Sequence, residues 1–268
     1  GDGSTGNPYL TIGKAIGVGA NIVKVKAGSH SLLGSAPASP VTTEWCVVQP
    51  DDGLAAYAVT LNATSTNRNT IAVRLSYKNF KYALTDTSSY PDGQAGARHL
   101  LFENMLFDKA AVGAPTVMLY RFSSVRMYDC KFASRSTSWV MGEFSTNFVS
   151  WFLDGVDFGE YTAATTELLN GAYQITCCYG QNIKLSGPNS TNPAPTYNNH
   201  FMLCNRLIKS KTEPNLTRGI SGADNTNITE GFAIIGNVFE NLQTTQPAVH
   251  LFSDGSAYTC NNLLFWHN

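Results

Sequence analysis

Apolar residues return along the chain at nearly constant intervals, which predicts a stack of repeated units. The intervals between these anchor residues are 25, 25, 26, 25, 25, 31 and 26 residues, and the anchors are Tyr82, Phe107, Phe132, Phe158, Ile183, Ile208, Phe239 and Phe265. Apolar residues also recur five and seven positions before most anchors, a period of two that is typical of a strand with one buried face. A fixed period of this length indicates a fold of stacked units.

The position three residues before each anchor holds only Asn, Asp or Gly, namely Asn79, Asn104, Asp129, Gly155, Gly180, Asn205, Gly236 and Asn262. These residue types adopt the left-handed backbone conformation at the least cost. We therefore predict a sharp bend in each unit, between a longer strand and a second short strand that carries the anchor inward. Asn104, Asp129 and Asn205 are expected to occupy equivalent bends.

Units of about 25 residues with two or three strands and an inward apolar stack are typical of a parallel β-solenoid. Helical repeats would need a sustained 3.6-residue apolar period, and propeller blades need roughly 40 or more residues each. The sequence therefore predicts an all-β protein, a single parallel β-helix domain of about ten coils. It would span residues 1–268, with regular coils at 71–268 and a cap with the first strand at 1–28.

The opening segment supports this fold class and carries a resemblance. A Gly-rich turn precedes Ile12 and Ile16 at helical spacing, and residues 21–28 then alternate like a strand. A short amphipathic helix is the expected cap for the open end of a strand stack. The segment resembles the start of right-handed β-helix proteins of the pectate-lyase-like superfamily at Asn7, Pro8, Tyr9, Thr11, Ile12, Ala15, Ile16, Val23, Val25 and Gly28. The resemblance implies a right-handed β-helix, of the kind found in phage tailspikes and polysaccharide-active proteins.

Composition narrows the function classes. A net charge of −1 argues against nucleic acid as a partner, since nucleic-acid binding calls for a basic surface. No apolar run approaches the roughly 18 residues that a membrane-spanning helix needs. The sequence has no initiator Met and no signal peptide, so we expect a processed product or an excised domain.

The six cysteines show no metal-binding spacing and no Cys-x-x-Cys motif. We expect most of them to be buried free thiols, with no disulfide between Cys178 and Cys260, which fall on distant coils. Abundant free thiols are more typical of assembly in a reducing cytosol than of secretion. A virion protein that is later exposed outside the cell fits this pattern, so the expected location is extracellular or on a virion surface.

One column of outward-facing positions contains residues that could act in catalysis or in substrate binding. Glu103 and Asp154 fall two rungs apart, with Cα atoms roughly 9–10 Å from one another. Hydrolysis of a glycosidic bond with inversion needs two carboxyl groups at about that separation. We take these two as candidate catalytic residues and Tyr128, Tyr179 and Lys131 as candidate substrate-binding residues. The alternative is that the acids are merely part of a polar surface.

A β-elimination mechanism is a second alternative. Lys131, Arg126 and Asp157 could converge on one face, and Ca²⁺ would be the cation if the protein were a lyase. Otherwise no cofactor is expected, because Asp154 and Asp157 alone do not make a calcium cage. The paired-Asp, Gly-His-Gly and Arg-x-Lys signatures of polygalacturonases and pectate lyases are absent from the sequence.

These observations favour a β-helix that binds or degrades glycans, as a phage or virion tailspike or fibre protein or a related polysaccharide lyase or hydrolase. The alternative is a non-catalytic structural or adhesive solenoid. The expected partners are a polysaccharide or cell-surface glycan and further copies of the chain, as a trimer, or further domains. Self-association is expected because the last rung carries Leu264, Phe265 and Trp266 without a cap.

Overall fold

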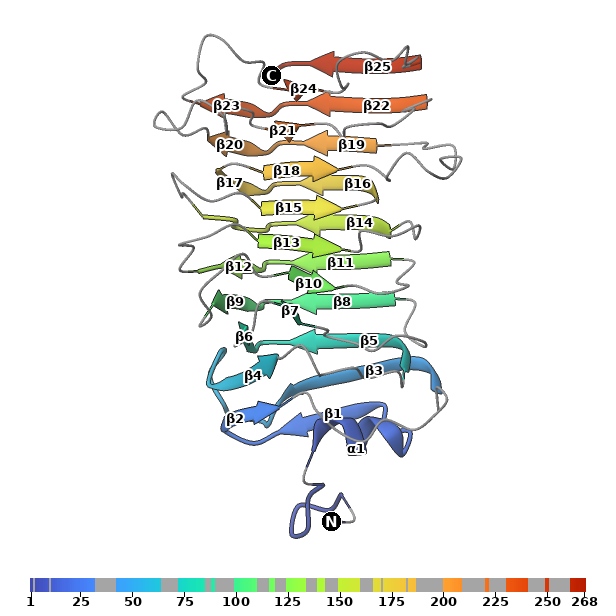
Figure 1. Cartoon of the computed structure of the whole chain (residues 1–268), viewed down its shortest axis with the longest axis vertical. Helices are drawn as coiled ribbons and strands as arrows, with labels where there is room; N and C mark the ends of the chain where they lie inside the picture. Colours follow the sequence, from blue (N-terminus) through green and yellow to red (C-terminus); the bar gives the residue numbers. More distant parts are fainter. Residues whose placement is uncertain are drawn as a thin grey trace. The chain divides into compact units, whose positions relative to one another are not determined.

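A computed structural model describes the chain at residues 1, 3–9, 11–31, 42–63, 72–84, 88–89, 99–109, 116–118, 124–133, 139–142, 149–159, 166–169, 171–181, 183–186, 200–208, 220–221, 230–240, 249–250 and 261–268. The chain divides into two compact units, residues 1–134 and 135–268, which are described separately. Within each unit, the strands of successive coils lie one beside the next (Figure 1).

The first unit contains one short helix and parallel strands. Helix α1 (Ile12–Gly17) precedes the strands, and Thr11 caps it by accepting a hydrogen bond from the Lys14 backbone N–H at 3.1 Å. One sheet contains β1 (Ile22–Val25), β3 (Thr42–Pro50), β5 (Ala72–Lys78), β8 (His99–Glu103) and β11 (Ser124–Tyr128). A second contains β2 (Gly28–Ser31), β4 (Val59–Ala63), β6 (Lys81–Leu84), β9 (Leu106–Lys109) and β12 (Lys131–Phe132), and β7 (Ser88–Ser89) pairs with β10 (Thr116–Met118).

The second unit repeats this arrangement in three ladders. The first contains β14 (Val149–Asp154), β16 (Gly171–Thr176), β19 (His200–Leu203), β22 (Glu230–Ile235) and β25 (Asn261–Trp266). The next contains β17 (Tyr179–Gln181), β20 (Arg206–Ile208) and β23 (Val238–Glu240). The third contains β13 (Trp139–Gly142), β15 (Thr166–Leu169), β18 (Ile183–Ser186), β21 (Ile220–Ser221) and β24 (Val249–His250).

Successive coils contribute successive strands to these ladders, and the strand pairs are parallel, as in β5 with β8 and β16 with β19. The protein is therefore all-β with little helix, and its arrangement is consistent with a parallel β-solenoid. No helix in the described part of the chain has the length and apolarity needed to cross a membrane. The expected capping helix is confirmed, because Ile12 and Ile16 of α1 are buried.

In the first unit the register predicted from the anchors is confirmed. Tyr82 pairs with Phe107, and Phe107 pairs with Phe132. Five positions earlier, Phe102 pairs with both Tyr77 and Met127. These side chains are buried. Tyr77 stacks on Phe102, and Phe107 stacks on Phe132 with ring centroids 4.8 Å apart. The in-register aromatic column is thus the core of this unit.

In the second unit the predicted register is wrong in two coils. Leu153 pairs with Ile175 and not with Cys178, and Leu207 rather than Ile208 is the residue that pairs with Gly180 and with Phe239. Ile183 begins β18, in a different ladder. Glycine is required at position 180 because an added Cβ would lie 2.6 Å from the Cβ of Phe158.

The last anchor is also misplaced. Phe265 pairs with Ile234, so it lies in the strand before a bend rather than after one. The physical reason is that coil length varies here: the bends fall at Gly155, Cys177, Cys204 and Gly236, at intervals of 22, 27 and 32 residues. A register predicted from a constant repeat length is therefore shifted wherever a coil is longer or shorter than that length.

The bend prediction is confirmed at Asn104 and Asp129, whose φ angles are 48° and 51°, and at Asn79, with φ 64°. It is wrong at Asn205. The left-handed residue of that coil is Cys204, with φ 53°, and Asn205 follows it. Cys177, with φ 52°, likewise takes the bend in place of Gly180. Asn262, proposed for the last bend, lies within β25, and His267 has φ 51° instead.

Asn205 is displaced from the bend because it belongs to a buried ladder of asparagines. Asn205 and Asn237 are each 1% exposed. Asn237 Oδ1 accepts from Asn205 N and Nδ2 at 3.0 and 2.8 Å, and Asn268 Oδ1 accepts from Asn237 N and Nδ2 at 3.1 and 2.8 Å. Asn205 Oδ1 in turn accepts from Cys178 N at 2.8 Å. Asn237 and Asn268 thus each satisfy a backbone and a side-chain donor of the preceding coil, and Asn205 satisfies a backbone donor, as buried polar groups require.

The bend conformation predicts opposite responses at two neighbouring positions. Replacing Asp129 by Gly should change the free energy of unfolding by less than about 0.5 kcal/mol, whereas Asp129→Val should lower it by about 1–2 kcal/mol, because φ is positive there. Arg126, exposed within β11, is the control, and there Gly should be worse than Val. Urea unfolding measures all four variants, and the same order at both positions would contradict the bend assignment.

The asparagine ladder predicts that the loss of stability on replacing one of its members depends on how deeply that member is buried. Asn237→Ala removes the acceptor for two buried donors of Asn205, so the free energy of unfolding should fall by about 2–4 kcal/mol. Asn268→Ala should cost less than about 1 kcal/mol, because water can reach the exposed end of the ladder. Urea denaturation with equal m-values for both variants is the measurement. Equal losses for the two variants would show that the buried bonds do not carry the stability.

Candidate functional site

The outward side of β5, β8 and β11 gathers several charged, hydroxyl and aromatic side chains of the first unit. Strand side chains alternate between faces, and Tyr77, Phe102 and Met127 point into the core. The opposite positions form what we term the outer face: Arg74, Ser76, Lys78, His99, Leu101, Glu103, Ser124, Arg126 and Tyr128. Ser76 and Ser124 are buried, and the other seven are partly or fully exposed. Parallel register thus brings residues 25 positions apart side by side on this face.

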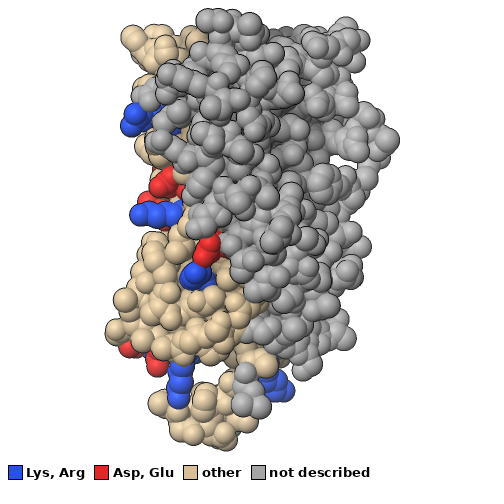
Figure 2. All heavy atoms as spheres, turned by 60° about the vertical axis from the view of Figure 1, so that its left-hand side comes forward, with Lys and Arg blue, Asp and Glu red and all other residues tan. Residues whose placement is uncertain are grey.

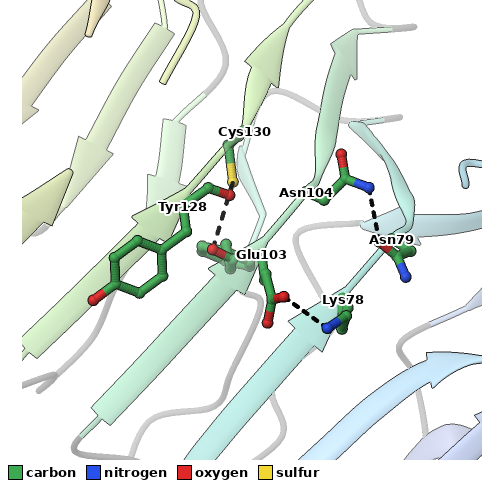
Figure 3. A network of polar contacts seen from close by, with 7 residues as sticks. Lys78, Asn79, Glu103, Asn104, Tyr128 and Cys130 are labelled. Atoms are coloured by element: carbon green, nitrogen blue, oxygen red, sulfur yellow. Dashed lines mark hydrogen bonds and ion pairs between the residues drawn. The ribbon is translucent and has the colours of Figure 1, made fainter. Parts of the chain in front are cut away.

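Lys78, Glu103 and Tyr128 form one column of this outer face, as the outward column predicted from the sequence requires. Glu103 Oε1 accepts a hydrogen bond from Lys78 Nζ at 2.7 Å, and both side chains are 39% exposed. The carboxylate of Glu103 is turned toward Lys78 and away from the ring of Tyr128 (Figure 3). An ion pair this exposed contributes under about 1 kcal/mol to stability, so its main effect is to orient the carboxylate.

The outer face carries more positive than negative charge. Arg74, Lys78 and Arg126 lie on it with Glu103, and Asp129 follows at the bend. His99 adds a titratable ring, whose Nδ1 lies 2.8 Å from Ser124 Oγ. Figure 2 shows acidic and basic side chains beside one another on the described part of the surface that it presents. The face thus offers both donors and acceptors to a polar ligand.

A hydrogen-bond chain fixes the bends beside the outer face. Asn104 Nδ2 donates to Asn79 Oδ1 at 2.8 Å, and Tyr57 Oη donates to Asn104 Oδ1 at 2.6 Å (Figure 3 shows the Asn pair). Burial, with a smaller contribution from the charge of Asp129, raises the pKa of Tyr57, so the phenol stays a donor. Sequence reasoning missed Tyr57, because it lies in the segment before the regular coils and shares no column with them.

The remaining predicted site residues lie elsewhere. Lys131 is exposed in β12, in the other sheet of the first unit from Glu103 and Tyr128. Asp154 is exposed at the end of β14 in the second unit. Because Glu103 and Asp154 belong to separate units, the groove expected between them stays a prediction. The convergence of Lys131 and Asp157 on one face also stays a prediction, because these residues belong to separate units.

Tyr179 and Asp157 of the second unit have local roles. The guanidinium carbon of Arg206 lies 5.7 Å from the centre of the Tyr179 ring, a cation–π contact. Asp157 Oδ1 accepts from the Gly159 backbone N–H at 2.8 Å, which closes its own turn. Among the described residues, no group of three or more His, Cys, Asp and Glu side chains is placed to hold a metal ion. The expectation about Ca²⁺ remains untested.

Five of the six cysteines are described, and all five are free thiols, as expected. Cys46, Cys130 and Cys178 are buried, but Cys177 and Cys204 are exposed, which the sequence did not indicate. Cys260 lies outside the described residues. Burial raises the pKa of the Cys46 thiol to about 11 and that of Cys130 and Cys178 to about 12.

This difference predicts selective labelling, because the thiolate is the reactive form. With iodoacetamide at pH 8, Cys177 and Cys204 should react at least about 100-fold faster than the three buried thiols, which stay protonated until the pH approaches their raised pKa values. Peptide mass spectrometry over time gives the rate at each site. The denatured protein is the control, in which all thiols should react alike. Rapid labelling of Cys130 in the native protein would contradict the burial.

Comparison with known proteins identifies no family for this chain. No protein-family model, no curated protein and no solved structure matches the chain. The function must therefore be inferred from the fold and the outer face alone.

Proposed function

We propose that the chain is a right-handed parallel β-helix that binds an extended polysaccharide on the outer face of β5, β8 and β11. The observation that carries the proposal is the column of Lys78, Glu103 and Tyr128, with Arg126 two positions before Tyr128. Tyr128 offers an aromatic ring for a sugar face, and the charged groups offer donors and acceptors for hydroxyl or carboxylate groups. Rungs about 4.8 Å apart present these groups repetitively, which suits a ligand that is itself a repeat.

Binding fits this column better than cleavage does. The Glu103 carboxylate already accepts from Lys78, and an ionised carboxylate is an acceptor that cannot deliver a proton. Hydrolysis would also need a second carboxyl group at a defined distance from the first. Asp154 is the predicted partner, and Asp129 at the adjoining bend is a second candidate within the same unit as Glu103.

The biological setting that we propose is a tailspike or fibre-type protein on a virion surface, or an extracellular polysaccharide-binding protein. A cell-surface glycan and further copies of the chain, as a trimer, are the proposed partners. The alternative, a structural solenoid without a glycan ligand, is favoured by the ion pairing of Glu103.

Binding to immobilised acidic and neutral polysaccharides tests the proposal. Tyr128→Ala should weaken binding of the preferred glycan by roughly tenfold, about 1.4 kcal/mol, because a stacking ring is lost. Tyr9→Ala is the matched control and should bind normally, since Tyr9 lies before α1 and away from the outer face. Binding to none of the polysaccharides would refute the proposal and favour the structural alternative.

The same samples separate binding from cleavage. Reducing ends would report a hydrolase, and an unsaturated product absorbing in the ultraviolet would report a lyase. If either product forms, Glu103→Gln should abolish it while leaving the circular dichroism spectrum unchanged. Turnover that survives Glu103→Gln would exclude the outer face as the catalytic site.

A further inference from the structure

Two exposed cysteines stand on neighbouring rungs of the second unit. Cys177 directly follows β16 and Cys204 directly follows β19, and the preceding residues Thr176 and Leu203 are paired in register. Both cysteines have the same left-handed backbone, with φ 52° and 53°. The Cys177 N–H donates to Leu203 O at 3.0 Å, which ties the two bends together. The two cysteine residues therefore belong to one exposed column.

The neighbours above and below this pair have no side chains. Gly155 occupies the bend before Cys177, and Gly236 the bend after Cys204, as the pairing of Asp154 with Thr176 and of Leu203 with Ile235 requires. A Cβ added at Gly236 would lie 3.6 Å from Cys204 Sγ, so a larger residue there would cover the sulfur. The glycines leave the two thiols open to solvent and to a ligand.

The distance between successive rungs limits which ligand Cys177 and Cys204 can share. In-register side chains of parallel strands stay about 4.8 Å apart. Both cysteines are free thiols, and no disulfide joins them. A zinc–thiolate bond is about 2.3 Å, so two bonds of that length in a line through one ion span about 4.6 Å. The rung spacing therefore suits a bridging ion with two thiolate ligands in line.

We propose that Cys177 and Cys204 form a two-coordinate site for a soft monovalent cation, for which copper(I) is the natural candidate because thiolate ligands select it. Each thiol releases its proton to solvent, and each sulfur donates an electron pair to the ion. The oxidation state of copper does not change, so no oxidant or reductant is needed. Buried Cys178 takes no part, because its Sγ is engaged with Thr176 O at 3.3 Å.

An anaerobic titration with copper(I), delivered from a chromogenic competing ligand, tests this site on the whole chain. One copper(I) ion per chain should bind, and X-ray absorption should show two sulfur neighbours and no third. Cys177→Ser and Cys204→Ser should each weaken binding at least 100-fold, with circular dichroism confirming that the variants fold. Cys130→Ala and Cys260→Ser, which leave the pair intact, are the controls and should bind as the wild type does.

Three results would overturn the proposal. These are wild-type protein that binds no copper(I), single serine variants that bind as tightly as the wild type, and loss of binding in Cys260→Ser, which would place the site elsewhere. A Cys177–Cys204 disulfide in peptide maps of protein kept under anaerobic, reductant-free conditions would also exclude it, since the two sulfurs would then be bonded to each other. None of these readouts depends on glycan binding.

Discussion

Parallel, in-register pairing between successive coils is the constraint on which the rest of this structure depends. Each strand hydrogen-bonds to the strand one coil before and one coil after it, so equivalent residues stand about 4.8 Å apart in columns. Each column therefore brings together the side chains of equivalent positions, whether they point into the core or toward the outside. Packing, bends and candidate sites are therefore all properties of columns rather than of single residues.

Inward columns stabilise the two units in different ways. In the first unit the position after the bend is apolar, with Phe80, Met105 and Cys130 all buried. In the second unit the same position holds buried Val156 and Cys178 in the first two coils and Asn205 and Asn237 in the next two, where the amide side chains bond to each other and to the backbone. A buried amide is tolerated only when its donors and acceptors are satisfied, and stacking identical residues in register satisfies them. One geometry thus supports both an apolar and a polar core.

Outward columns supply the two places where the protein could act. The Lys78, Glu103 and Tyr128 column brings residues 25 positions apart within reach of one ligand. The Cys177 and Cys204 pair arises in the same way, between glycines that leave it open. In both cases the distance between reactive groups is set by backbone hydrogen bonds. The scaffold therefore positions these groups without needing long-range side-chain contacts.

The sequence by itself determined the fold class and the columns of the first unit, because coils of constant length keep Tyr82, Phe107 and Phe132 in phase and place Asn104 and Asp129 at the bends. It also predicted that Glu103 and Tyr128 would be neighbours on the outside. Only the tertiary structure decided the register of the second unit, where coil lengths vary and backbone pairing, not residue counting, sets the phase. It placed Cys204 at the bend and Asn205 inside, because the amide is needed in the buried ladder. The same pairing brought Cys177 beside Cys204, a contact that no periodic pattern in the sequence records.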